Sequence, residues 1–450
     1  MLSHTWYLWW KIVPEIIIEC GLQYAGCTLF YCIPMKHRTT IDEISIALAS
    51  ADLTLLKSPA SLMNGLLGKV LFFGYQYHYT KSEAHLKEVE TSLDYLGTYL
   101  ESNVLSTNLF TGYAGFGWTI QHLINLNIIS TDQFIDFEEL DDIIFSSVRS
   151  NTESTNYDLF CGLIGKGIYF LERPCTDRKA KIESICKEII SLKTVDSYGF
   201  AWRDTLSEIG NPNLKKELNG EVDYLYNLGL AHGIPSVLSF LSISFSKGIR
   251  NALLLDTIKM TSEWLLNFKK HGSVAFYGHF IDSAYRDVLK DKSSLAWCYG
   301  DLSIAISLIH AYKATKITNY LNHGFEIAKL AATRKLHNSF IFNDAKHNLA
   351  NTGFCHGLTG VSHIFFRLFQ STGESIFKNA YQYWINQLYN FRDPQNLEMA
   401  GFTSYELDPE PTVFQNDITL LDGLAGIGLT LLTQEHNITE HWDSVFLTNL

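Results

Sequence analysis

A glycine pattern that recurs seven times constrains the fold of this 450-residue chain more than any other feature. In each copy a glycine is followed by two residues, a small residue and then an apolar run. The copies are spaced by the high forties to about seventy residues, which leaves room for two helices and their connections. They begin at Asn64-Gly65, Thr111-Gly112, Cys161-Gly162, His232-Gly233, Tyr299-Gly300, His356-Gly357 and Asp422-Gly423.

Each copy predicts the start of a buried helix. The glycine permits a sharp turn, and the small residue lies on the same helix face one turn later, where it allows close packing. The run that follows, such as 361–369, is apolar nearly all round, whereas segments between the copies, such as 86–96, are amphipathic. The chain is therefore predicted to be all-α: an α/α-toroid, or double barrel, with seven inner and seven outer helices. An open solenoid is the rival, but closing the ring removes exposed ends.

The repeats organise the chain as one domain over residues 1–450, with the repeated part from about 62 to 435. The widened interval between the third and fourth glycines predicts a small insertion at about 190–225. The run Leu225–Phe245 is long enough to span a membrane, but Asn227 and Pro235 interrupt it, so we expect a loop followed by a buried helix.

The amino-acid composition limits the cellular compartments and the classes of partner that are expected for this chain. A net charge of −12 argues against a nucleic-acid binder and is typical of a cytoplasmic protein. The aromatic N-terminus lacks the basic region of a signal peptide, so none is expected. Eight cysteines are too sparse for a disulfide scaffold, and Cys20, Cys27 and Cys32 are interpreted as small buried apolar residues.

If the inner helices are parallel, the residue before each first glycine lies at one rim of the ring. Cys298 and Cys355 come one position earlier, and His356 follows Cys355 directly. Two sulfurs and one imidazole suit zinc and leave one tetrahedral position open, as in a catalytic site. His232 would converge on the same rim, where helix N-termini favour thiolates.

Three motifs give the chain a family resemblance: Asn227-Leu-Gly-Leu-Ala-His232-Gly233, Trp297-Cys298-Tyr299-Gly300 and Cys355-His356-Gly357. From about Leu62 to the C-terminus the sequence resembles the lanthionine synthetase C-type cyclases. The resemblance implies a double α/α-barrel that binds one Zn²⁺ per chain through Cys298, Cys355 and His356. It implies an enzyme that adds cysteine thiols to dehydroalanine or dehydrobutyrine in a dehydrated precursor peptide, forming thioether rings.

The same resemblance implies roles for three further residues. His232 would be an acid/base residue, giving or taking a proton, with Tyr299 in the same pocket and Asp158 as the active-site aspartate. The family's arginine four residues before the first cysteine is replaced by Ser294. A dehydratase and an exporter are the expected partners, at the inner face of the cell membrane through peripheral association.

Alternatives stay open at this point. Cys298 and His232 taken singly suit structural roles, Asp158 suits a helix cap, and His122, His279 and His363 are not expected to be ligands. Two other functions compete with the cyclase. One is a zinc-thiolate peptide prenyltransferase, and the other is a non-catalytic adaptor that binds zinc and a thiol such as glutathione.

Overall fold

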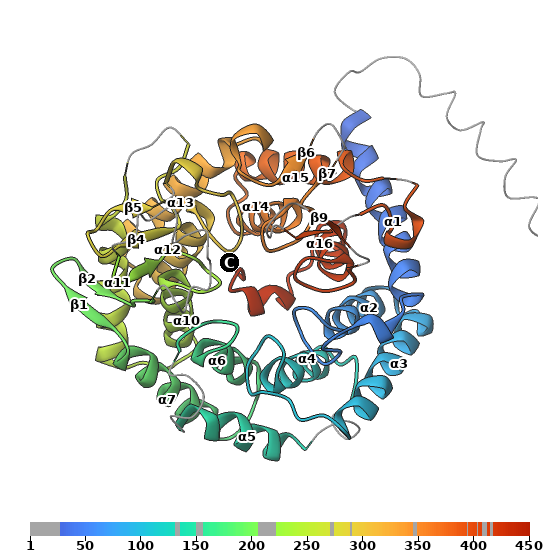
Figure 1. Cartoon of the computed structure of the whole chain (residues 1–450), viewed down its shortest axis with the longest axis horizontal. Helices are drawn as coiled ribbons and strands as arrows, with labels where there is room; N and C mark the ends of the chain where they lie inside the picture. Colours follow the sequence, from blue (N-terminus) through green and yellow to red (C-terminus); the bar gives the residue numbers. More distant parts are fainter. Residues whose placement is uncertain are drawn as a thin grey trace, which may run out of the picture.

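The computed structural model describes residues 28–130, 136–149, 156–205, 222–270, 274–288, 290–344, 349–393, 395–402, 404–406, 412–414 and 417–450. In this part of the chain 14 α-helices form two concentric rings (Figure 1). The inner ring consists of α2 (Leu67–Thr80), α4 (Tyr113–Asn125), α6 (Leu163–Glu172), α10 (Ile234–Ser246), α12 (Asp301–Thr315), α14 (Leu358–Thr372) and α16 (Leu424–His436). The outer ring consists of α1 (Thr28–Ala49), α3 (Glu83–Leu100), α5 (Phe137–Arg149), α7 (Arg178–Ser191), α11 (Ala252–Asn267), α13 (Thr318–Thr333) and α15 (Ser375–Asn390). The predicted toroid is confirmed.

The two rings differ in burial as their sequences predict. Eleven of the 13 residues of α10 are buried, because this helix is enclosed by its neighbours and by the outer ring. In α3 the buried residues are Val89, Ser92, Leu93 and Leu96, which form a single stripe at helical spacing. An amphipathic helix of this kind covers the inner ring with one face and keeps its charged face in water.

The first helix closes the ring. α1 precedes the repeats in sequence, but it packs against α16, and α16 packs against α2. The N-terminal helix thus supplies the outer partner of the last inner helix. Residues 1–27, with Cys20, Cys27 and the region where no signal peptide is expected, lie outside the described residues, and Cys32 lies in α1.

Short β-strands lie in the connections between the helices. The all-α prediction did not include them. β1 (Thr194–Asp196) pairs with β2 (Gly199–Ala201), and β3 (Leu225–Asn227), β4 (Phe280–Asp282) and β5 (Asp287–Val288) form an antiparallel sheet in that order. Two further hairpins join β6 (Asn343–Asp344) to β7 (Leu349–Ala350) and β8 (Ser404–Glu406) to β9 (Thr412–Phe414). Short 3₁₀ helices are η1 (Leu53–Leu55), η2 (Lys290–Lys292), η3 (Leu336–Asn338), η4 (Leu397–Met399) and η5 (Trp442–Phe446).

Part of the predicted insertion is β1, β2 and β3, and its residues 206–221 lie outside the described residues. The run from Leu225 holds strand β3 and then the buried helix α10, so the helix is confirmed and the preceding loop is partly a strand. Among the described residues no helix is both long and apolar enough to cross a bilayer.

Seven segments lead into the inner helices, and we call them rim loops one to seven in chain order. Each ends at the first glycine of a repeat, and in loop three the next backbone N–H, that of Leu163, donates to the Asn156 carbonyl (2.9 Å). Loops two, six and seven repeat this bond at Tyr113, Leu358 and Leu424. The glycine is required because a Cβ on Gly162 would collide with the same Asn156 carbonyl.

Backbone bonds tie neighbouring rim loops into a circle. Leu62 N–H donates to Phe110 O (3.0 Å), Leu109 to Phe160 O (3.0 Å), Leu230 to Cys298 O (3.0 Å) and Phe354 to Leu421 O (2.8 Å). Leu421 N–H then donates to Met63 O (3.0 Å), which joins the seventh loop to the first. Leu295 N–H donates to Ser339 O (2.8 Å) and joins loop five to loop six, whereas in the described residues loops three and four meet through the side chains of Asp158 and His232. Both junctions belong to the candidate site.

Candidate metal centre and active site

One group of metal-ligating side chains emerges among the described residues: Cys298, Cys355 and His356. Their ligand atoms all lie within 4.8 Å of one another, although loops five and six are separated by helices α12 and α13. The two cysteine side chains are buried and His356 is exposed. The circle of rim loops explains this convergence, because both cysteines are the second residue before a first glycine.

Two of these side chains have shifted pKa values because the three groups are crowded together. The contact with the Cys298 sulfur, together with burial, raises the pKa of Cys355 well above its usual value. The charge of Cys355 outweighs the effect of burial and raises the pKa of His356 to about 9. Two crowded sulfurs resist losing both protons alone, whereas a bound dication reverses that preference. Two sulfurs and one imidazole fit zinc with one position left for another ligand.

His232 lies at the junction of loops three and four, beside Asp158. Its Nδ1 atom is 2.5 Å from Oδ2 of Asp158, and its side chain is 45% exposed. Burial lowers the pKa of His232, but the hydrogen bond to Asp158 and the nearby carboxylates raise it more, so the net shift is upward. The result is an accessible imidazole that holds its proton to higher pH than usual.

Asp158 is not the helix cap considered as its alternative, because α6 begins after Gly162 without a side-chain cap, but it does stabilise the turn of loop three. Its Oδ1 atom accepts the backbone N–H groups of Phe160 and Cys161, both at 2.7 Å. Ser61 and Asn108, at the same position of loops one and two, accept the N–H groups of Asn64 and Thr111. In loop three the accepting group is a carboxylate, so a second oxygen remains for His232. Asp158 can therefore hold the turn and contact His232 at the same time.

Tyr299 is partly buried between His279 and the β3–β4–β5 sheet. Its ring stacks on His279 with centroids 4.9 Å apart and lies 5.5 Å from the ring of Phe280. Burial and the neighbouring Cys298 raise the pKa of the Tyr299 hydroxyl, so it remains a hydrogen-bond donor at neutral pH. The hydroxyl interacts with the buried side chain of Asn227, which sequence reasoning quoted in a motif but gave no role.

The backbone of the segment around Ser294 is held by the side chains of His279 and Arg334. The Ser294 N–H donates to Nε2 of His279 (3.0 Å), and burial lowers the pKa of His279 to about 4, which leaves this nitrogen free to accept. Arg334 donates to the backbone carbonyls of Ser293 (2.6 Å) and Asn338 (2.9 Å). This arginine stabilises the backbone of loop five.

Sequence reasoning also missed Asp204. Its Oδ1 atom accepts the Tyr157 hydroxyl (2.6 Å), and its charge helps to raise the pKa of His232. The histidines not expected to be ligands lie outside the ligand group: His122 contacts Tyr75 and Glu172, and His363 contacts Asp443. No local motif marks Asp204, because its place depends on pairing with Leu225 across the insertion.

Comparisons with known proteins agree with this architecture. A family model described as lanthionine synthetase C-like protein matches residues 57–447. Nisin biosynthesis protein NisC from Lactococcus lactis subsp. lactis is 24% identical over 408 residues, which cover 86% of this chain and 88% of that protein. A solved nisin cyclase matches with a TM-score of 0.69 and 18% identity, covering 91% of this chain and 97% of its own. At that identity the structural match supports the fold.

Proposed function

This chain belongs to the lanthionine synthetase C-like family, and we propose that it is a zinc-dependent cyclase that forms thioether rings in a dehydrated precursor peptide. The observation that carries the proposal is the meeting of Cys298, Cys355 and His356 within 4.8 Å, on the same rim as the His232–Asp158 pair. The backbone bond from Leu230 to Cys298 O ties the loop of His232 to the loop of the first ligand. The names of the nisin relatives support a peptide as the substrate.

Cys298, Cys355 and His356 would hold the zinc, and the bound metal would lower the pKa of an incoming cysteine thiol so that it loses its proton near pH 7 and stays nucleophilic. The sulfur forms a bond to the β-carbon of the dehydroamino acid, and the electron pair of the double bond moves toward the α-carbon and carbonyl. The thiol proton leaves to solvent, and a new proton is required at the α-carbon. No further reactant is needed, so the mass of the peptide does not change.

His232 is the group that delivers this proton. Asp158 holds Nδ1, which leaves Nε2 to face the substrate, and the raised pKa of His232 keeps the ring protonated near neutral pH. Asp158 is itself fixed by two backbone N–H groups, so the imidazole has a defined orientation. The Tyr299 hydroxyl, protonated because its pKa is raised, donates to the oxygen on which negative charge develops.

The proposed substrate defines the partner reactions. Dehydroalanine and dehydrobutyrine arise when serine and threonine lose water, so a dehydratase must act on the peptide first. An exporter that removes the finished product and a peripheral location at the inner membrane face are part of the same proposal.

The test is direct. Zinc-loaded protein is incubated with a synthetic peptide that contains one dehydroalanine and one cysteine, and free thiol is counted by alkylation and mass spectrometry. Cyclisation is expected to remove the thiol at unchanged mass. A persistent thiol on a peptide that binds the zinc-loaded protein supports the adaptor instead, and a mass gain with an isoprenyl diphosphate supports the prenyltransferase.

A further inference from the structure

The C-terminal segment, residues 438–450 with η5, lies in the middle of the ring formed by the inner helices (Figure 1). Phe446 and Trp442 in this segment are fully buried, and so is Asp443. The proposed function assigns this segment no task. The segment contacts loops five and six, and these contacts indicate which residues it holds in place.

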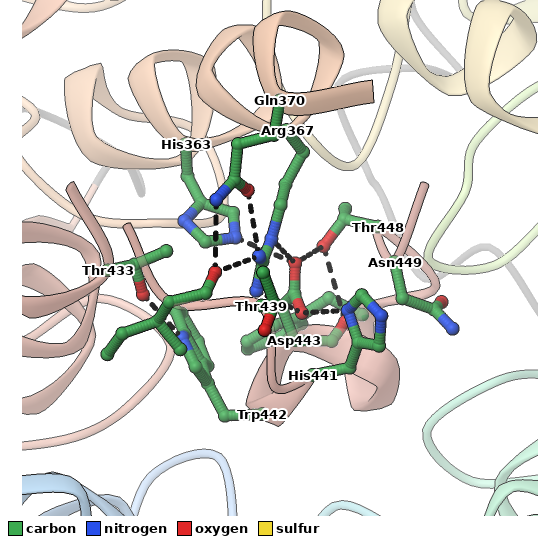
Figure 2. A network of polar contacts seen from close by, with 12 residues as sticks. His363, Arg367, Gln370, Thr433, Thr439, His441, Trp442, Asp443, Thr448 and Asn449 are labelled. Carbon is green, nitrogen blue, oxygen red and sulfur yellow. Dashed lines mark hydrogen bonds and ion pairs between the residues drawn. The ribbon is translucent and has the colours of Figure 1, made fainter. Parts of the chain in front are cut away.

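A buried charge network anchors the segment to α14 (Figure 2). Arg367 donates through Nε to Oδ2 of Asp443 (2.8 Å) and through Nη2 to Oδ1 (3.0 Å), and His363 Nε2 is 2.8 Å from Oδ2. Arg367 also donates to the carbonyls of Ile438 (2.7 Å) and Glu440 (3.0 Å). One side chain thus fixes three points of the segment, which leaves little freedom for the residues that follow.

The other side of the segment contacts the two loops that carry the cysteines. The ring of Phe446 stacks on Phe354, with centroids 4.4 Å apart, and meets Trp297 edge to face at 5.0 Å. Trp297 Nε1–H donates to the Phe446 carbonyl at 2.8 Å. Trp297 immediately precedes Cys298, and Phe354 immediately precedes Cys355. One phenylalanine therefore touches the residue next to each sulfur.

This contact occurs where loops five and six bring the two sulfurs together. The backbone bond that joins these loops runs from Leu295 N–H to Ser339 O (2.8 Å), far from Cys355 along the chain, whereas at the sulfurs themselves the two loops meet through the cysteine side chains. A tetrahedral metal site tolerates errors of only a few tenths of an ångström in its ligand positions. The spacing of the two sulfurs therefore depends on the contacts that fix Trp297 relative to Phe354.

We propose that Phe446, anchored through Asp443 and Arg367, is a positioning residue that sets the spacing of Cys298 and Cys355 and thereby the affinity and geometry of the metal site. The inference rests on the proposed zinc function. It assigns the C-terminal segment the role of a brace beneath the ligands, in addition to filling the ring.

The first test compares Phe446→Leu with Phe377→Leu in the full chain. Phe377 is equally buried and stacks on Phe365 in α14 at 6.4 Å, but it lies in α15 away from the ligands. Both variants lose a buried ring, and both are expected to lower the melting temperature by a few degrees. Zinc affinity, measured by competition with a chelator, is expected to fall about ten-fold or more in Phe446→Leu alone. The visible bands of the Co²⁺-loaded protein are expected to shift in that variant and not in the control.

A second pair of variants tests the proposal if Phe446→Leu does not fold. Trp297→Phe removes the hydrogen bond to Phe446, and Trp202→Phe removes a similar bond from a buried indole to the Ile189 carbonyl. Weaker zinc binding in the first variant alone supports the brace. Equal zinc affinity and identical Co²⁺ bands within each pair overturn it. If the unmodified protein binds neither metal, the proposed function fails, and that result is distinct from failure of the brace.

Discussion

His232 and Asp158 lie 74 residues apart in the chain, and Nδ1 of His232 is nonetheless 2.5 Å from Oδ2 of Asp158. The other oxygen of Asp158 accepts two backbone N–H groups, so the carboxylate cannot turn away without breaking its own loop. Asp158 thereby fixes the orientation of the imidazole and also favours its protonated form.

Replacing His232 by glutamine is expected to slow ring closure by about two to four orders of magnitude, because a positioned acid contributes that much to proton transfer. Zinc content should not change, since His232 is not among the three ligands. Thiol loss in the dehydroalanine peptide measures the rate, and metal analysis measures the zinc. His323→Gln, on the outer helix α13, is the control. A variant that cyclises at the normal rate would remove His232 from the mechanism.

Asp158→Asn is expected to move the alkaline limb of the pH–rate profile to lower pH. Asp158 raises the pKa of His232 against the effect of burial, so without its charge the imidazole loses its proton at lower pH. The protonated form that donates to the α-carbon then disappears earlier as the pH rises. The profile of kcat is compared with that of the unmodified protein. An unchanged alkaline limb would show that another group sets it.

Cys355→Ala is expected to abolish stoichiometric zinc binding, because two donors hold the metal poorly. Cys186→Ala is the matched control, since Cys186 is a buried cysteine in α7 and lies outside the ligand group. Zinc is quantified after gel filtration of both variants. Full occupancy in Cys355→Ala would contradict the ligand assignment.

Asp443→Asn is expected to lower the free energy of unfolding by about 3–5 kcal/mol, since it leaves the buried Arg367 without its counter-charge. The exposed pair of Lys329 and Glu374 provides the control, and Lys329→Gln should cost less than about 1 kcal/mol. Denaturant titration measures both variants.

The Asp443 network also predicts a pH dependence of stability. Arg367 and His363 outweigh burial and hold the pKa of Asp443 well below its usual value. A lowered pKa contributes stability that is present above the unfolded-state value of about 4 and is lost as the pH falls below it. Asp443→Asn should therefore flatten the stability curve in that acidic range. If the variant loses stability equally steeply as the pH falls, other carboxylates are responsible for the loss.

Gly360→Ala and Gly97→Ala should change stability in opposite directions. A Cβ on Gly360 would collide with the Phe354 carbonyl, next to Cys355, whereas a Cβ on Gly97 meets nothing within 4 Å. The first change is expected to cost about 1–3 kcal/mol, and the second to gain up to about 1 kcal/mol because alanine favours the helix. Thermal unfolding of both variants measures the difference.

The glycine repeat made the ring predictable, because one local pattern, repeated seven times, has the same physical meaning each time. The rim position of Cys298, Cys355 and His356 followed from that register. The contact of His232 with Asp158 could not be predicted in detail, since it depends on how two loops meet. No pattern marked α1 as the partner of α16, because a single amphipathic helix does not reveal what it packs against.

The network of Asp443 and Arg367 was equally hidden from sequence reasoning. Charged residues usually lie on surfaces, and only the folded ring brings these two together in its interior. The brace of Phe446 on Trp297 and Phe354 was hidden for the same reason, since it joins segments that no repeat relates.

The bonded circle of rim loops has a consequence for how the protein meets its substrate. Five neighbouring pairs of loops are tied by backbone bonds, and the seventh loop is tied to the first. Among the residues that the structure describes, the junction without such a bond is the one where Asp158 meets His232. A peptide that pushes the loops apart will therefore strain the rim least beside the proposed proton donor, while the rest of the circle keeps its shape.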